Sequence, residues 1–204
     1  DISSTSIDLY NYDVMTISCW VNVFGPGSSG SGGAIIGKYT QGNLINSSFA
    51  LQNFNTAVQT IGNGADDWNS QNNEIIYGSW HHIIVEYDRI DSSVFIYVDG
   101  SLATQGLLTY NNTNLANVLV TIGRLSVDSG TENINYFHGL IDDIGIWNRA
   151  LTQQEISDLY NTTASSSCIE LSPSADTLCA GESTTLTASF PNSRWQNYYF
   201  EDFE

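Results

Sequence analysis

Two adjacent carboxylates, Asp142 and Asp143, lie where the pattern of the chain changes most sharply, at residues 139–160. The first half of this segment alternates with period two, which predicts a strand, and the second half follows helical spacing. In the predicted strand, Asp142 shares a face with three apolar residues, Leu140, Ile144 and Ile146. If that face is buried, the carboxylate must be hydrogen-bonded, paired or bound to a metal.

Aromatic rings in polar loops offer a second chemistry, because the C–H faces of sugars stack on them while amides and carboxylates take the hydroxyls. The best candidate is Trp68 in a polar loop at 65–73, with Asp66, Asp67 and Asn69 beside it. Tyr110 and Tyr136, each next to asparagines, are further candidates. The alternative for Trp68 is that its ring folds onto its own loop. Three other tryptophans lie on strand patterns and are expected in the core: Trp20, Trp80 and Trp147.

Hydrolytic chemistry is not supported. Retaining glycoside hydrolysis needs two carboxylates about 5 Å apart across the sugar ring. The nearest acidic run, at 201–204, has the wrong spacing and lies at the end of the chain. His81 and His82 are adjacent on a predicted strand, so they point to opposite faces and cannot form one metal pair. The sequence therefore predicts a protein that is not an enzyme.

The charge balance excludes other classes of partner. The chain of 204 residues has 22 acidic and 5 basic residues, for a formal charge of −17. Such a surface repels phosphate backbones, so nucleic-acid binding is excluded, and anionic membranes are disfavoured. No apolar run is long enough to span a bilayer, so no membrane insertion is expected. Most of the acidic residues are interpreted as solubilising, and a few as calcium ligands.

Period-two segments separated by turn residues dominate up to residue 147 and predict two packed antiparallel sheets. Thr152 and Glu155 form a capping box that marks the start of one short helix at 153–160. The predicted strands are 6–10, 16–24, 34–39, 48–54, 58–61, 74–77, 80–88, 93–98, 101–105, 118–123 and 137–147.

Three pieces in this order resemble laminin-G-like, concanavalin A-like jelly-roll domains. They are MTISCWVN at 15–22, WHHIIVEYD with the following VFIYVDG at 80–100, and GLIDDIGIWNRAL with its helix at 139–160. The resemblance implies an all-β domain over 1–163, a two-sheet antiparallel jelly-roll sandwich with one short C-terminal helix. It leaves function open, because lectins, adhesion modules, spacers and glycoside hydrolases share this fold.

The resemblance also implies a structural calcium ion at the rim of the sandwich. Asp142 matches the most regular acidic position of such domains, and Asp143 is its neighbour. Adjacent loops could contribute Asp8, Asp13 and Asp128. The alternative is that Asp142 hydrogen-bonds backbone amides or the side chains of Trp80 or His82.

The composition changes after residue 163. Residues 164–204 resemble a linker and the truncated start of an Ig-like or PKD-like repeat, as found in exported surface proteins of Bacteroidota. Cys168 and Cys179 flank a short loop and could form a disulfide if the protein is exported. Cys19 lies within an apolar strand pattern and is expected to be a buried free thiol.

Two functions follow as expectations. The first is a non-enzymatic extracellular module, secreted or attached to the cell surface, that binds a glycan or another surface ligand and carries a structural calcium ion. The second is a structural or assembly module, a spacer or filament subunit whose partners are other protein domains. The Trp68 loop distinguishes between them, since only the first needs it to contact a sugar.

Overall fold

The chain divides into two compact units, Asp1–Tyr160 and Asn161–Glu204. The computed structural model describes residues 11–27, 32–38, 40–41, 49–61, 67–70, 74–108, 119–127, 133–162, 170–173 and 186–189. The predicted domain boundary after residue 163 stays a prediction. In the second unit, β14 (Glu170–Pro173) pairs antiparallel with β15 (Leu186–Ser189).

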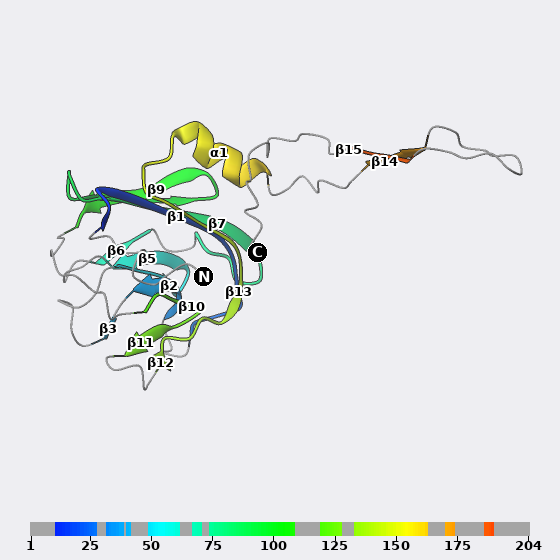
Figure 1. The fold of residues 1–204 in the computed structure, drawn as a ribbon. Helices are drawn as coiled ribbons and strands as arrows, with labels where there is room; N and C mark the ends of the chain where they lie inside the picture. The colour runs from blue at the N-terminus through cyan, green and yellow to red at the C-terminus, as the bar shows by residue number, and fades with distance from the viewer. Residues whose placement is uncertain are drawn as a thin grey trace, which may run out of the picture. The chain divides into compact units, whose positions relative to one another are not determined.

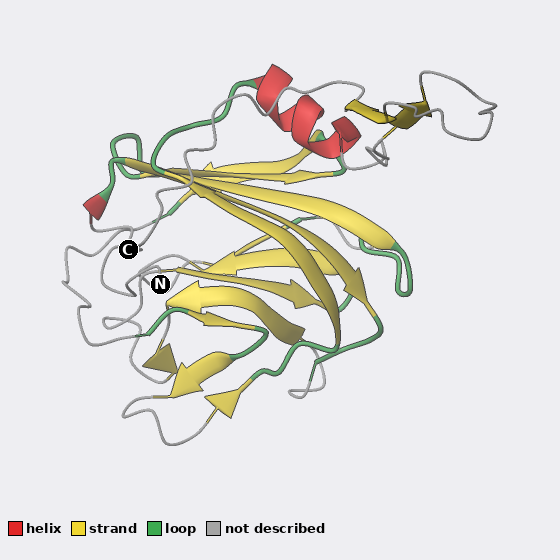
Figure 2. Cartoon of the chain, turned by 45° about the vertical axis from the view of Figure 1, so that its right-hand side comes forward, coloured by secondary structure: helices red, strands yellow, loops and turns green. Residues whose placement is uncertain are grey.

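The first unit is a sandwich of two five-stranded antiparallel sheets, with one helix on the outer side of one sheet (Figures 1 and 2). Sheet A has the strand order β13 (Gly139–Trp147), β1 (Val14–Val23), β7 (Trp80–Asp88), β8 (Ser93–Val98) and β9 (Ser101–Leu107). Sheet B has the order β10 (Thr121–Ile122), β2 (Gly32–Lys38), β4 (Phe49–Phe54), β5 (Ala57–Ile61) and β6 (Asp67–Asn69). A smaller sheet joins β12 (Asn133–Ile134), β11 (Leu125–Val127) and β3 (Thr40–Gln41). This architecture confirms the predicted all-β jelly-roll sandwich.

Strand alternation produces the core. In β1, every second side chain from Met15 to Val23 is fully buried between the sheets, and the residues between them face outward. Ile83, Val85 and Tyr87 of β7 continue the same buried layer. Cys19 is a free, fully buried thiol, as predicted, and burial raises its pKa to about 12.

Helix α1 (Gln153–Thr162) covers part of the outward face of sheet A (Figure 1). Ile156 of α1 and Leu151, two residues before the helix, pack on Ile84 of β7, and Trp147 packs against this cluster. The predicted capping box is present: the Thr152 amide donates to Oε2 of Glu155 at 2.8 Å, and the Glu155 amide donates to Oγ1 of Thr152 at 3.2 Å. No helix within the described ranges is long and apolar enough to cross a membrane.

A β-bulge in β13 changes the predicted phase of that strand. Ser18 pairs with Gly145 but Trp20 pairs with Asp142, so Asp143 and Ile144 both lie opposite Cys19. Asp143 has a φ of +47°. The expectation that Asp142 shares a face with Ile144 and Ile146 was therefore wrong. Ile141, Ile144 and Ile146 pack against the core, whereas Asp142 is exposed on the outward face.

Two further predicted elements differ from those in the structure. The segment 74–77 is not a strand: the Ile75 amide donates to the carbonyl of Thr56, and the Ile76 amide donates to Nε2 of His81. Gly78, with a φ of +81°, then turns the chain into β7. The predicted loop around Trp68 contains the short strand β6 instead. The predicted strand 6–10 lies outside the described residues.

Candidate functional site

The outward face of sheet A presents a row of side chains at the end where β7 begins. Asn22 of β1 pairs with Leu140 of β13 on one side and with Trp80 of β7 on the other. Paired residues of neighbouring strands lie on the same face of a sheet. The three side chains therefore stand side by side across three strands.

Large apolar side chains are exposed at this end. Trp80 is 42% exposed, Leu140 is 49% exposed, and Phe24, two residues beyond Asn22, is 50% exposed. The Phe24 ring meets the imidazole of His138 edge-on, with ring centroids 5.9 Å apart. We call Phe24, Asn22, Trp80 and Leu140 the Trp80 surface. Exposed apolar side chains that adjoin one another in this way are typical of binding sites.

Asn22 gives the Trp80 surface a polar centre. The side chain is 9% exposed, and its Nδ2 donates to the carbonyl of Gly78 at 3.2 Å. Its Oδ1 is buried and has no hydrogen-bond partner among the described residues. A buried acceptor without a partner costs free energy, on the order of 1–3 kcal/mol. A ligand hydroxyl that donates to this oxygen would recover that cost.

β13 comes very close to β1 at Asn22. A Cβ added to Gly139 would lie 2.1 Å from the carbonyl oxygen of Asn22. Only glycine allows this approach, which sets Leu140 beside Asn22.

An aromatic stack lies one row further along the same face. Trp20 stacks on His82 with ring centroids 5.1 Å apart, and on Tyr160 of α1 at 5.9 Å. Nε1 of Trp20 and Nδ1 of His82 are buried without a hydrogen-bond partner in the described part of the chain. Burial lowers the pKa of His82 to about 4, and the charge of Asp99 opposes this shift only in part. The imidazole is therefore neutral near pH 7.

His82 also pairs with Ser18, whose Oγ lies 2.8 Å from Nε2 of the imidazole. This is not a nucleophile and its base. Both side chains are 2% exposed, and Nδ1 of His82 has no carboxylate partner. The carboxylate of Asp99 bonds the other histidine, accepting from Nδ1 of His81 at 2.8 Å and from the His82 amide at 2.9 Å.

His81 and Asp99 fix the turn after β8. Because the Ile76 amide donates to Nε2 of His81, Nδ1 carries the hydrogen and donates to Asp99. Burial of the Asp99 carboxyl raises its pKa, but the hydrogen bonds from the His81 side chain and the His82 amide outweigh this and lower it. The two imidazoles have different side-chain partners, Ser18 for His82 and Asp99 for His81, as expected for adjacent residues on opposite faces of a strand.

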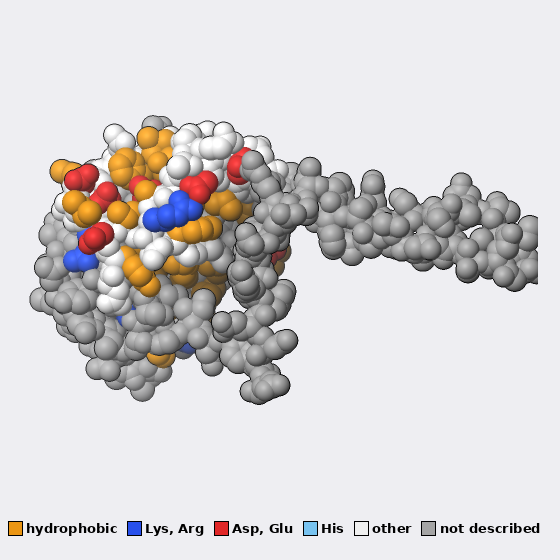
Figure 3. Space-filling model, turned by 45° about the horizontal axis from the view of Figure 1, so that its top comes forward, with side chains coloured by type: hydrophobic (Ala, Val, Ile, Leu, Met, Phe, Trp, Pro, Cys, Tyr) orange, Lys and Arg blue, Asp and Glu red, His pale blue; other side chains and the backbone are white. Residues whose placement is uncertain are grey.

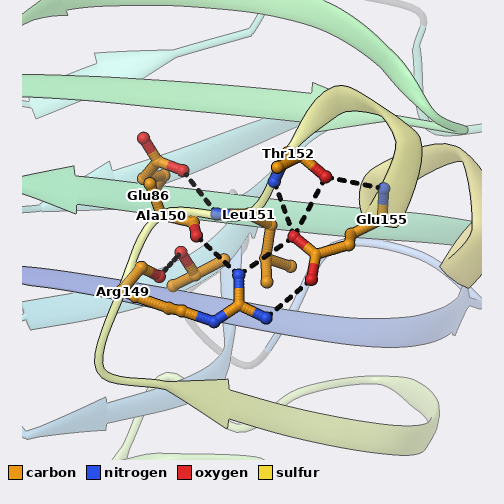
Figure 4. Close-up of polar contacts among 7 residues, drawn as sticks. Glu86, Arg149, Ala150, Leu151, Thr152 and Glu155 are labelled. Atoms are coloured by element: carbon orange, nitrogen blue, oxygen red, sulfur yellow. Dashed lines mark hydrogen bonds and ion pairs between the residues drawn. The ribbon is translucent and has the colours of Figure 1, made fainter.

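A polar network at the other end of sheet A fastens α1 (Figure 4). Arg149 binds Glu155 with two hydrogen bonds, Nη1–Oε2 at 2.9 Å and Nη2–Oε1 at 2.7 Å. Oε2 of Glu86 accepts from the Leu151 amide at 3.3 Å, and Oγ1 of Thr16 donates to the Arg149 carbonyl at 2.7 Å. Because these groups form hydrogen bonds with one another, we interpret the network as structural: it holds α1 on sheet A.

The family of the chain follows from its sequence and agrees with this architecture. A sequence profile of the concanavalin A-like lectin/glucanases superfamily matches residues 2–157. The chain belongs to this superfamily. No curated protein matches the chain by sequence. The predicted Ig-like or PKD-like repeat, and the Bacteroidota context, stay predictions.

Solved structures share the fold of this superfamily member at low sequence identity. The native heptameric SAP-like pentraxin of Limulus polyphemus is 16% identical, with a TM-score of 0.55, and the match covers 74% of this chain and 70% of the pentraxin. The CBM40 of the Ruminococcus gnavus IT-sialidase, bound to α2,3-sialyllactose, is 13% identical with a TM-score of 0.57, covering 75% and 90%. Botulinum neurotoxin type C, whose cell entry depends on two ganglioside molecules, is 19% identical with a TM-score of 0.55, covering 82% and 39%. The chain thus spans well under half of the toxin chain.

The residues predicted to bind sugar are not brought together in the described part of the chain. Asp67, Trp68 and Asn69 form β6, where Trp68 pairs with Thr60 and its neighbours pair with Ile61 and Gln59. Tyr136 is 47% exposed and bridges to Ala34 of β2, with β4 and β5 between that strand and β6. Asp66 and Tyr110 lie outside the described residues.

The calcium site stays a prediction. Asp142 is exposed, and its Oδ1 accepts from the Asp143 amide at 2.9 Å. In the described ranges no three His, Cys, Asp or Glu residues gather as a metal would require. The backbone carbonyl of Asp13 accepts from the Arg89 amide at 2.8 Å. Asp8, Asp128, Cys168 and Cys179 lie outside the described residues.

Sequence reasoning missed the Trp80 surface because it assigned Trp80 to the core, which was wrong. The signal was present in β7: Ile83, Val85 and Tyr87 define the buried phase, so Trp80 belongs to the outward phase with His82. Trp147 does lie in a cluster, but with α1 on the outward face. The pairing of Asn22 with Leu140 depends on the register between β1 and β13, which no local pattern shows.

Proposed function

We propose that this chain is a non-catalytic carbohydrate-binding module and that its glycan binds on the Trp80 surface. The observation that carries the proposal is the arrangement of two exposed apolar side chains, Trp80 and Leu140, on either side of the buried, unpartnered Oδ1 of Asn22. Membership of a superfamily of lectins and glucanases supports it. So do the sialyllactose-bound module and the ganglioside-dependent toxin that share the fold.

The chemistry of the Trp80 surface suits a sugar. A pyranose ring has an apolar C–H face, which would stack on the indole of Trp80, and hydroxyl groups at its rim. Asn22 Oδ1 would accept from one hydroxyl, and the exposed carboxylate of Asp142 in the next row would accept from another. A purely apolar ligand would leave Asn22 unpaired.

The proposal includes the absence of catalysis at this surface. Hydrolysis of a glycosidic bond would require a second carboxylate across the sugar from Asp142. Within the described residues, the carboxylate of Asp99 is held by His81 and His82, and Glu86 bonds the Leu151 amide at the α1 end of the sheet. The remaining parts of the proposal are an extracellular location, within a secreted or surface-attached protein, and a calcium ion bound by Asp142 or Asp143.

A second function is a spacer or assembly module whose partners are other protein domains. The same exposed residues favour it, because Phe24, Trp80 and Leu140 would also fit an apolar protein surface. The buried acceptor of Asn22 favours the sugar over this alternative.

A glycan array with the purified chain tests the proposal. We expect binding to a defined subset of glycans, and we expect Trp80→Ala to reduce it by a factor of ten or more, corresponding to about 1.4 kcal/mol or more. Ile122→Ala is the control, since Ile122 is a similarly exposed apolar residue but belongs to β10 of the other sheet. Trp68→Ala tests the loop first predicted from the sequence. Glycan binding that is retained in Trp80→Ala but lost in Trp68→Ala would contradict the Trp80 surface as the binding site. Absence of binding to any glycan would contradict carbohydrate binding as the function.

A further inference from the structure

The Trp80 surface also indicates which glycans it would accept, an inference that rests on the proposed function. Trp80 and Leu140 belong to β7 and β13, which flank β1. Neighbouring strands lie about 4.8 Å apart, so these two side chains are set about 10 Å apart across the row. One sugar ring over Trp80 does not reach Leu140. A ligand that contacts both needs at least two linked rings, with Asn22 below the linkage.

In the described part of the chain, no Lys or Arg side chain is among the residues that form the Trp80 surface. Arg89 and Arg149 follow the far ends of β7 and β13, beyond Asp88 and Trp147, and Arg149 is bound to Glu155. In the view of Figure 3, which brings the α1 side forward, the prominent Lys and Arg side chains (blue) lie beside acidic ones (red). Lys38 is fully buried, and Arg124 lies in the connection between β10 and β11.

Besides the indole of Trp80 and the imidazole of His138, which meets Phe24, the polar groups at the Trp80 surface are hydrogen-bond acceptors or negative charges. Asn22 contributes its buried Oδ1, and Asp142 contributes an exposed carboxylate one row away. Recognition of an anionic sugar relies on charge-assisted hydrogen bonds from Arg or Lys. Here a sugar carboxylate or sulfate would instead be repelled by the carboxylate of Asp142 and by the net charge of −17.

We infer that the Trp80 surface binds neutral glycans of two or more linked sugar rings through their hydroxyl donors, and that it rejects their sialylated, sulfated and uronic-acid counterparts. This would separate it from the sialyllactose-bound module that shares its fold.

Matched glycan pairs test this inference. Affinity is measured by titration calorimetry for each neutral oligosaccharide that binds on the array and for its sialylated or sulfated counterpart, with the monosaccharide as the length control. We expect the neutral member to bind about tenfold more tightly or better, and the monosaccharide to bind weakly. The charge penalty should shrink as salt is raised.

A pair of substitutions at one exposed position separates the effect of charge from any loss of folding. Leu140→Lys adds a cation at the exposed edge of the surface, and Leu140→Gln is its uncharged control. We expect Leu140→Lys, and not Leu140→Gln, to narrow the preference for the neutral glycan. Tight binding of sialylated glycans that is lost in Trp80→Ala would overturn the inference while supporting the proposed function. Absence of binding to both members of every pair would overturn both.

Discussion

The indole of Trp147 folds back over Gly145, two residues before it in β13. A Cβ added to Gly145 would lie 2.3 Å from Cη2 of Trp147. The indole in turn packs against the cluster of Ile84, Leu151 and Ile156 that holds α1 on sheet A. Gly145 therefore makes room for the side chain on which the helix rests.

Replacing Gly145 by alanine should weaken the docking of α1. The added methyl group displaces the Trp147 indole, and overpacking of this kind costs about 1–3 kcal/mol. Urea unfolding followed by far-UV circular dichroism measures the loss. In a Trp147→Leu background the same substitution should cost less, because the ring is gone. An equal cost in both backgrounds would contradict the contact.

Stability should depend on pH through His82. Its pKa is about 4 in the folded chain against an ordinary 6.5, so between these values the unfolded chain takes up a proton that the folded chain does not. The free energy of unfolding is therefore highest above pH 6.5 and falls as the pH drops toward 4, by about 3 kcal/mol at most. His82→Gln should flatten this slope. Equal slopes in wild type and His82→Gln would show that another group is responsible.

The capping box should contribute measurably to stability. Thr152→Ala removes the acceptor of the Glu155 amide and the hydroxyl that donates to Oε2 of Glu155, and we expect a loss of about 1 kcal/mol. Thr152→Ser retains both bonds and should cost much less. Thermal unfolding of the three proteins gives the comparison. An unchanged melting temperature in Thr152→Ala would mean that the Thr152 hydroxyl does not contribute to holding α1.

The predicted calcium ion should stabilise the chain if it binds. A ligand that binds only the folded state raises the melting temperature as its concentration increases. We expect a chelator to lower the melting temperature and Asp142→Asn to abolish the difference between the calcium and chelator samples. Asp91→Asn, an exposed aspartate in the turn after β7, is the control. The same melting temperature with calcium and with chelator would contradict the predicted calcium site.

The sequence was sufficient for the sandwich but not for its binding surface. Alternation in β1 and β7 follows directly from the two-residue period, and the capping box places the start of α1. The bulge at Asp143 could not be predicted, because the hydrophobic pattern does not show that the backbone of an aspartate has a positive φ. After the bulge, the residues of β13 that would face outward face the core instead. The Trp80 surface depends on the register of three strands, and register is set by contacts distant in sequence.

Binding of a glycan on the Trp80 surface can be followed through the signals of the tryptophan side chains. The chain has five tryptophans, so its ¹⁵N–¹H NMR spectrum should contain five indole signals, which Trp→Phe variants assign. On titration with a neutral oligosaccharide that binds on the array, we predict that the Trp80 signal shifts most and the Trp20 signal, one row away, shifts less. The Trp68 signal should stay in place. If only the Trp68 signal shifts and the Trp80 signal is unchanged at saturation, the glycan does not bind on the Trp80 surface.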